Sequence, residues 1–455
     1  MMNIEPDKHL TVLSLNCWGL FVVSKERKFR LQAIADYISQ QDYDLVALQE
    51  VWMWSDFDTI KETTESVLPY SRYFYSGTLG SGLVLLSRFP IVCSNYVQFT
   101  LAGRPLKIFQ GDFYVGKGFG SVCVDHPDIG LIDVYTTHLQ AAYGDQDDYE
   151  AQRITECWQI ANSVRMSAAQ GRHVILAGDF NSIPTSHCYQ LLKHHGFMTD
   201  SWLEMHRDVT DSQELTAFDC IQQFGITCDS PINTWSKHLL KQEPYAKDIG
   251  DRLDYIFYRR SPQLQCQSSQ VVMYEPIPNT NKSYSDHFGV LSVFQITNQT
   301  SSALNSQFAP IASALAKPTT TELVPGQLKP MIRLLQKDLY RATTTANGHL
   351  FWFALSLLIV FATWTSLLIA PSIFMSMLIG LVLVLFSALA IVFLLVGFVF
   401  GKTEQRSLRQ YLKDMQLYLD RLEPTLNTTH SSSASLLSPT NTSISTSDGL
   451  VIKNK

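Results

Sequence analysis

The sequence has little charge, because Asp, Glu, Lys and Arg make up only 17% of its 455 residues, against roughly 25% in an average soluble domain. A run of 60 residues, 342–401, contains none of these four residue types. Soluble domains do not go without charge over such a length, so this run predicts a part of the chain that lies in a membrane.

The sequence also lacks a regular cysteine spacing, since its eight cysteines form no CxxC pair and no regular framework. This excludes a disulfide scaffold, and we expect reduced thiols. The first ten residues are charged and lead into no apolar segment of signal-peptide type. We therefore expect the catalytic part to stay in the cytosol.

The charges are unevenly divided along the chain. Residues 1–296 contain 23 Lys and Arg against 34 Asp and Glu, a net charge of −11, whereas residues 297–455 contain 12 against 7, a net charge of +5. An acidic first part argues against nucleic acid as a partner, because phosphate-backbone affinity needs clustered basic residues. The basic second part fits an anionic membrane face, and we expect an anionic phospholipid as a further partner.

Two segments of the uncharged run are long enough to cross a bilayer. Residues 350–370 would form a helix of roughly 31 Å and residues 373–400 one of roughly 42 Å, against a hydrocarbon core of about 30 Å. Pro371 and Ser372 between them predict a tight turn. The alternative is two buried helices of a globular core. Basic residues flank both ends, which predicts a hairpin with both flanks in the cytosol: Lys329, Arg333, Lys337, Arg341, Lys402, Arg406, Arg409 and Lys413.

The rest of the chain divides by composition. We expect residues 1–296 to form a catalytic domain, residues 297–341 a linker and basic juxtamembrane segment, and residues 342–401 the two spans. Leucines at steps of three and four predict an amphipathic interfacial or partner-packing helix at 402–423. The Ser- and Thr-rich residues 424–455 predict a disordered tail.

The first 296 residues alternate short runs rich in Val, Ile, Leu and Tyr with longer amphipathic runs. This predicts an α/β fold with two sheets covered by helices. We expect strands within 10–15, 45–48, 82–86, 120–124, 131–136, 173–177, 252–258 and 290–294, and helices within 25–41, 146–170 and 188–194.

Polar residues stand where these predicted strands end. A carboxylate directly after an apolar strand is costly to bury without a partner, so six such places predict an active site. Each alone has a structural alternative: a turn cap at Asn16, a helix cap at Glu50, or an Asx turn at Asp179 to Asn181. The candidates are Asn16, Glu50, His138, Asp179, Asn181, Asp254, Asp286 and His287.

The motifs around these residues, NCWG, LQEVW, THL, GDFN, RLDY and SDH, resemble the DNase-I-like exonuclease, endonuclease and phosphatase superfamily. With GSGLVLLSRFPI at 80–91 and the double span, the chain resembles its neutral, magnesium-dependent sphingomyelinases. This resemblance implies a four-layered α/β sandwich, a C-terminal transmembrane hairpin, and phospholipase-C-type hydrolysis of sphingomyelin to ceramide and phosphocholine.

The resemblance also implies roles for the candidate residues. His287 is expected as the general base and Asp254 as the group that orients it. Asp179 is expected to orient the water, Asn181 to bind a phosphoryl oxygen, and His138 to stabilise the transition state. Magnesium prefers oxygen ligands, which suits Glu50, with Asn16 and Asp286 beside it: the predicted metal ligands are Glu50, Asn16 and Asp286, and Mn²⁺ is an alternative metal.

One further motif, the GxxxxGK of residues 111–117, is not a nucleotide site. Gly118 stands where a P-loop needs Ser or Thr, and a β-like run follows. Lys117 is instead predicted to contact a lipid phosphate, with a solvated loop lysine as the alternative.

The motifs leave the substrate open, because the superfamily also contains nucleases and inositol-phosphate phosphatases. Charge and the hairpin favour a membrane lipid, which is sphingomyelin or a lyso-phosphocholine lipid such as lyso-platelet-activating factor. A membrane-anchored scaffold without activity is a further alternative. We expect a two-span protein of the endoplasmic reticulum or another intracellular membrane, with both termini in the cytosol.

Overall fold

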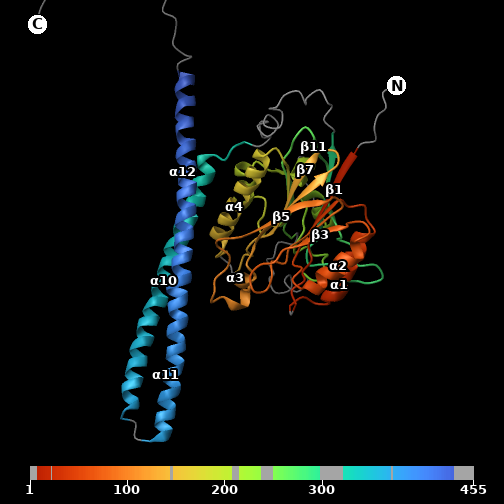
Figure 1. Cartoon of the computed structure of the whole chain (residues 1–455). Coiled ribbons are helices and arrows are strands. Elements are labelled where there is room, and N and C mark those ends of the chain that lie inside the picture. Colours follow the sequence, from red (N-terminus) through yellow and green to blue (C-terminus); the bar gives the residue numbers. More distant parts are fainter. Residues whose placement is uncertain are drawn as a thin grey trace, which may run out of the picture.

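The computed structural model describes residues 8–21, 23–143, 147–206, 215–236, 250–297, 321–369 and 372–434, with side chains to 423. An N-terminal domain of two sheets and their helices lies beside a long pair of C-terminal helices (Figure 1). All eight predicted strands and all three predicted helices of the domain are present, with shifted ends.

The first sheet has six strands in the order β11-β12-β1-β2-β4-β3. β1 and β2 are parallel, and the other neighbours are antiparallel. The strands are β1 (Lys8–Asn16), β2 (Leu45–Gln49), β3 (Tyr70–Tyr73), β4 (Val84–Ser87), β11 (Leu264–Val272) and β12 (Gly289–Ile296).

The second sheet also has six strands, in the order β5-β6-β7-β8-β10-β9. Only β7 and β8 are parallel within it. The strands are β5 (Ile91–Gln98), β6 (Gly118–His126), β7 (Gly130–His138), β8 (His173–Asp179), β9 (Thr199–Asp200) and β10 (Asp254–Tyr258).

The two sheets face each other across a shared core. Val12 and Leu85 of the first sheet belong to the same buried cluster as Val134 and Ile175 of the second. α1 (Arg27–Ser39) and α2 (Trp54–Thr64) cover the outer face of the first sheet. α4 (Glu150–Ala169), α5 (His187–Gln190) and the π-helical η2 (Leu191–His195) cover that of the second. The four-layered sandwich is confirmed.

Short helices complete the domain at its loops. They are η1 (Ile108–Gln110), α3 (Asp112–Val115), α6 (Ser201–Met205) and α7 (Ala217–Phe224). α3 lies at the lower edge of the domain, the side towards which the C-terminal hairpin extends (Figure 1).

The C-terminal helices form the predicted hairpin. α10 (Pro325–Leu367) is followed by α11 (Ile373–Leu394), η3 (Leu395–Phe400) and α12 (Gly401–Ala434), and the latter three run on as one helix. Both apolar helices are long enough to cross a membrane, and only 6% of each apolar window is buried in the protein, which disfavours a globular core. Ser372 caps α11 through Met375 N at 3.3 Å, and Pro371 lies outside the described residues.

The hairpin also packs on the N-terminal domain. Leu328 and Met331 of α10 and Leu408 and Met415 of α12 join the cluster that contains α4. α10 therefore begins inside the segment predicted as a linker, and α12 continues the predicted 402–423 helix to residue 434. Residues 298–320 and 435–455, which hold most of the predicted linker and tail, lie outside the described residues.

Candidate active site

The registers of both sheets bring the predicted site residues to one edge. Asn16 ends β1 beside Gln49, the residue before Glu50. His138 pairs with Asp179 at the ends of β7 and β8, and Asp254 begins antiparallel β10 opposite Asp179. Asp286 and His287 precede β12, which returns antiparallel to β1. The site therefore straddles the ends of both sheets.

His287 and Asp254 form a buried hydrogen-bonded pair. His287 Nδ1 lies 2.8 Å from Asp254 Oδ2, and the two side chains are at most 9% exposed. Thr227 Oγ1 accepts the Asp254 amide at 3.2 Å, and Thr227 O accepts the Phe288 amide at 2.7 Å. Thr227 thus fixes the backbone on both sides of the pair, whose geometry suits an oriented imidazole.

Charge controls the protonation of this imidazole. Burial acts to lower the pKa of His287, but Cys228, Asp254 and Asp179 outweigh it and raise that pKa well above the ordinary value. Burial raises the pKa of Cys228 to about 12, so its thiol stays neutral near pH 7. Of the three groups that raise the pKa of His287, Asp254 and Asp179 are therefore the two that can carry a charge near pH 7.

Asp179 lies at the centre of the group. Its Oδ2 accepts Asn16 Nδ2 at 2.9 Å and lies 3.6 Å from His138 Nε2 and 3.9 Å from His287 Nε2. Its Oδ1 accepts the Asn181 amide at 2.9 Å, so the Asx turn considered as an alternative is present as well. Burial and the charge of Asp254 raise the pKa of Asp179 to about 6.

His138 is the neutral histidine of the site. Burial, with help from Lys117 and His287, lowers its pKa well below the ordinary value. Its Nδ1 is buried and has no hydrogen-bond partner among the described residues. A neutral imidazole with a free ring nitrogen can donate or accept once a substrate brings a partner.

Glu50 and Asp286 form the other side of the site and are both partly buried. Glu50 Oε1 accepts Asn16 Nδ2 at 3.1 Å, and Ser285 Oγ donates to Asp286 Oδ1 at 3.2 Å. Burial and the charge of Asp286 raise the pKa of Glu50, and burial raises that of Asp286. Asn16 turns its amide nitrogen to Glu50, while its oxygen accepts the Trp18 amide at 3.0 Å.

A divalent cation fits this donor set. Among the described residues, ligand atoms of Asp179, Asp254 and His287 lie within 4.8 Å of one another, and Glu50 and Asp286 add two more carboxylates. Burial raises the pKa of Glu50, Asp286 and Asp179, and repulsion from a neighbouring carboxylate adds to the rise in each case, so a bound cation would stabilise their ionised forms. Oxygen-rich, negatively charged sites of this kind suit hard divalent metals.

Lys117 lies beside the site and is not a solvated loop lysine, since it is 3% exposed. Its Nζ donates to Leu139 O at 2.7 Å and lies 3.0 Å from Asp112 Oδ1. Asn181 Nδ2 donates to the same Leu139 O at 3.0 Å. The side chains predicted to bind a phosphoryl group are therefore adjacent, and both bond to a backbone carbonyl.

Several backbones at the site are held in strained conformations. Glu50, Asn181 and Trp18 have φ values of 59°, 44° and 48°, which are uncommon for residues other than glycine. A Cβ at Gly19 would lie 2.2 Å from Glu50 O, so only glycine fits there. Such strain persists where surrounding structure enforces it and is concentrated at functional sites.

Sequence reasoning missed Arg30, which holds the loops around the site. This fully buried residue of α1 donates to the carbonyls of Cys17 and Tyr284, each at 3.0 Å, and to that of Trp18 at 2.6 Å. It thereby links the loop after Asn16 to the loop before Asp286. The available signal was an arginine on the apolar face of an amphipathic helix.

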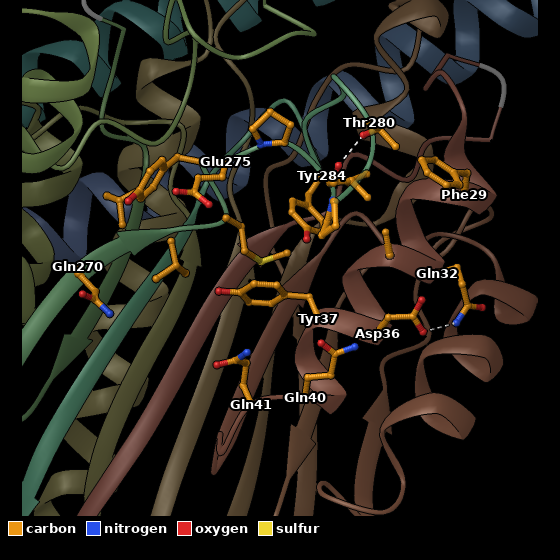
Figure 2. Close-up of a pocket in the computed structure, with 18 of the residues that line it drawn as sticks. Phe29, Gln32, Asp36, Tyr37, Gln40, Gln41, Gln270, Glu275, Thr280 and Tyr284 are labelled. Atoms are coloured by element: carbon orange, nitrogen blue, oxygen red, sulfur yellow. Dashed lines mark hydrogen bonds between the residues drawn. The ribbon is translucent and has the colours of Figure 1, made fainter.

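A cavity in the described part of the chain lies away from these residues. A pocket of about 770 Å³ is lined by α1 and the 270–284 segment, including Tyr37, Asp36 and Tyr284 (Figure 2). Gln32 donates to Asp36 across one wall at 2.9 Å. None of the predicted site residues lines this pocket.

Comparisons with known proteins agree with this site. A model described as the endonuclease/exonuclease/phosphatase family matches residues 13–287. An inositol phosphosphingolipids phospholipase C of Schizosaccharomyces pombe is 38% identical over 307 residues, covering 66% of this chain and 71% of the relative. Sphingomyelin phosphodiesterase 2 of Homo sapiens is 34% identical over 252 residues, covering 55% and 56% of the two chains.

Among solved structures, beta toxin of Staphylococcus aureus aligns with a TM-score of 0.48 at 19% identity, over 62% of this chain and 99% of that chain. The family match ends at residue 287, before the hairpin begins. The chain belongs to the endonuclease/exonuclease/phosphatase family, and its homologues include proteins named sphingomyelin phosphodiesterase 2 and putative neutral sphingomyelinase.

Proposed function

We propose that the protein is a divalent-metal-dependent phospholipase C that cleaves the head group from a membrane sphingolipid, with sphingomyelin as substrate and ceramide and phosphocholine as products. The observation that carries the proposal is the buried His287–Asp254 pair, 2.8 Å apart, beside a surplus of carboxylates. The names of both relatives describe phosphodiester cleavage of sphingolipids.

The reaction needs a base, an oriented water and donors to the phosphoryl oxygens. His287 takes the proton of the attacking water through Nε2, while Asp254 fixes Nδ1 and stabilises the imidazolium. Asp179, close to Nε2, orients the water. The new bond joins the water oxygen to phosphorus, and the bond from phosphorus to the ceramide oxygen breaks. The leaving oxygen takes up a proton to become the hydroxyl of ceramide, which balances the proton that His287 removes from the water.

The remaining residues act on the phosphoryl group. Asn181 and Lys117 would turn from Leu139 O to phosphoryl oxygens, and the unpartnered Nδ1 of neutral His138 leaves its ring free to reorient towards the leaving oxygen. We assign the metal to Glu50 and Asp286, because both are partly exposed while Asp254 and His287 bond to each other. Asn16 positions Glu50 and Asp179 by donating to both. When bound, Mg²⁺ or Mn²⁺ would offset charge on the phosphoryl oxygens.

The head group is the part of this proposal that a direct assay must decide. A relative named for inositol phosphosphingolipids supports phosphoinositol as the second candidate, and lyso-phosphocholine lipids are a third. The test presents radiolabelled sphingomyelin, inositol phosphosphingolipid and lyso-phosphatidylcholine to the full chain in mixed micelles, with Mg²⁺, Mn²⁺ or EDTA. Release of phosphocholine from sphingomyelin with Mg²⁺ but not EDTA is expected, and cleavage of plasmid DNA faster than of any lipid would overturn the proposal.

We also propose that the hairpin spans an intracellular membrane, with the catalytic domain and C-terminal helix on the cytosolic side. The matched basic flanks of the two spans support this topology, and an anionic lipid surface would be their partner. Tags at both ends should be digested by protease in intact microsomes. Protection of either tag would refute the topology.

A further inference from the structure

We propose that the loop formed by residues 106–109 inserts into the bilayer interface beside the hairpin and holds the active site against the membrane. The proposed partner is a lipid surface. The activity part of its test rests on the lipid substrate proposed above, whereas the fluorescence part does not.

The loop exposes apolar side chains that no other part of the described chain covers. Phe109 is fully exposed, Ile108 is 61% exposed and Leu106 is 46% exposed. An adjacent group of exposed apolar side chains usually marks an interaction surface rather than ordinary solvent contact. The exposed Lys107 between them adds a positive charge suited to lipid phosphates.

The loop is held firmly in this exposed conformation. Tyr114 donates to Pro105 O at 2.7 Å, before the loop. Tyr143 donates to Gln110 O at 3.2 Å, and Tyr149 to Gln110 Oε1 at 2.5 Å, after it. The backbone between these anchors forms the η1 turn. Exposure of Ile108 and Phe109 is therefore built into the fold.

The hairpin places the loop at the depth of the membrane interface. A cleft of about 320 Å³ separates the 98–107 segment and Phe113 from the two helices, and Leu106 and Lys107 line it opposite His349 and Val396. Phe113 also contacts Phe400, with ring centroids 5.2 Å apart. His349 lies eight residues, roughly 12 Å, past Arg341 and inside the uncharged run. With the hairpin in a bilayer, the loop lies at the boundary of head groups and acyl chains.

The same loop leads directly into the active site. α3 follows it, and Asp112 at the start of α3 lies 3.0 Å from Lys117 and accepts Gln140 Nε2 at 2.9 Å. Figure 1 shows α3 at the edge of the domain on the side towards which the hairpin extends. Insertion of the loop would therefore bring the site to the lipid head groups.

Fluorescence tests insertion without any need for catalysis. Cys93 is the one exposed cysteine among the described residues, so Cys93→Ser removes its reactivity, and Phe109→Cys carries an environment-sensitive dye. Val92→Cys on β5 is the matched control, since Val92 is 60% exposed, like Ile108. In phosphatidylcholine vesicles containing the full chain, we expect nitroxide-labelled acyl chains to quench the dye at 109, and iodide to quench the dye at 92. Equal iodide quenching at both positions overturns the proposal.

Activity tests the consequence of insertion. The double variant Ile108→Asp, Phe109→Asp should lose at least about tenfold in rate on vesicle substrate, yet stay within about twofold of wild type on a water-soluble phosphocholine diester. Val92→Asp should match wild type on both. Equal losses on the two substrates would place the role of the loop in chemistry or folding and overturn the proposal. Absence of all lipid hydrolysis by wild type would refute the proposed function while the quenching result stands.

Discussion

Asp254→Asn tests the central pair of the site with the smallest change in shape. In wild type, His287 Nδ1 lies 2.8 Å from the Asp254 carboxylate. The substitution removes the charge and leaves an amide oxygen that can still accept the hydrogen bond from Nδ1. A hydrogen bond to a charged group contributes roughly 1.5–3 kcal/mol, against about 1 kcal/mol for a neutral one. Losing that difference, together with the charge that stabilises the imidazolium, should lower kcat/KM by about 10- to 100-fold.

The pH profile separates this effect from a general loss of structure. A general base acts when deprotonated, so wild-type activity should rise with pH through the pKa of His287, which its neighbouring carboxylates raise. Asp254→Asn removes one of them, and the pKa of His287 should fall. The acid limb of kcat/KM should therefore move to lower pH while the plateau decreases, measured from pH 5 to 9 on a water-soluble phosphodiester at saturating Mg²⁺.

Asp133→Asn is the matched control for this experiment. Asp133 is a buried carboxylate on β7, bonded by Ser167 Oγ at 2.6 Å and by Arg172 at 3.1 Å. Its loss should lower the Tm without moving the acid limb. If Asp254→Asn leaves the limb in place or moves it to higher pH, then Asp254 does not govern the base, and the assignment of His287 is wrong.

Three further predictions follow from the same geometry. His287→Ala should lower kcat by roughly 100-fold or more without rescue by Mg²⁺, as titrations of the purified variant would show. Glu50→Gln should shift the Mg²⁺ dependence of activity to higher concentration, and an unchanged titration curve would contradict its ligand role. Burial raises the pKa of Glu156 to about 7, so the free energy of unfolding of wild type falls as pH rises from 4.5 through 7. In chemical denaturation, Glu156→Gln should therefore be more stable than wild type by up to about 3 kcal/mol at pH 8, with no gain below pH 5.

The sequence predicts the central strands because their residues are apolar on both faces. β1, β2, β7 and β8 are buried along most of their lengths, and each contains several Val, Ile or Leu residues. The missed strands lie at or near the sheet edges, where side chains meet solvent. β5 (IVCSNYVQ) is exposed along most of its length, so no continuous apolar run identifies it.

The sequence identifies the site residues because they stand at the ends of predicted strands, but it does not predict which of them contact one another. Asn16 bonds to Asp179, 163 positions away, and this pairing depends on how two separate sheets stack. Burial of Lys117 depends likewise on Asp112 and Leu139 O. Arg30 is invisible to motif reasoning, because its partners are backbone carbonyls that any sequence would supply.

The second sheet is linked mechanically to the hairpin. One continuous cluster runs from Leu176 of β8 through Ile154 of α4 to Met331 of α10 and Met415 of α12. Packed interiors transmit displacement because they hold few voids. Since β8 ends at Asp179, the orientation of the hairpin relative to the domain also fixes how the site is oriented relative to the hairpin. The packing that holds the hairpin against the domain is therefore continuous with the packing behind the strand that carries Asp179.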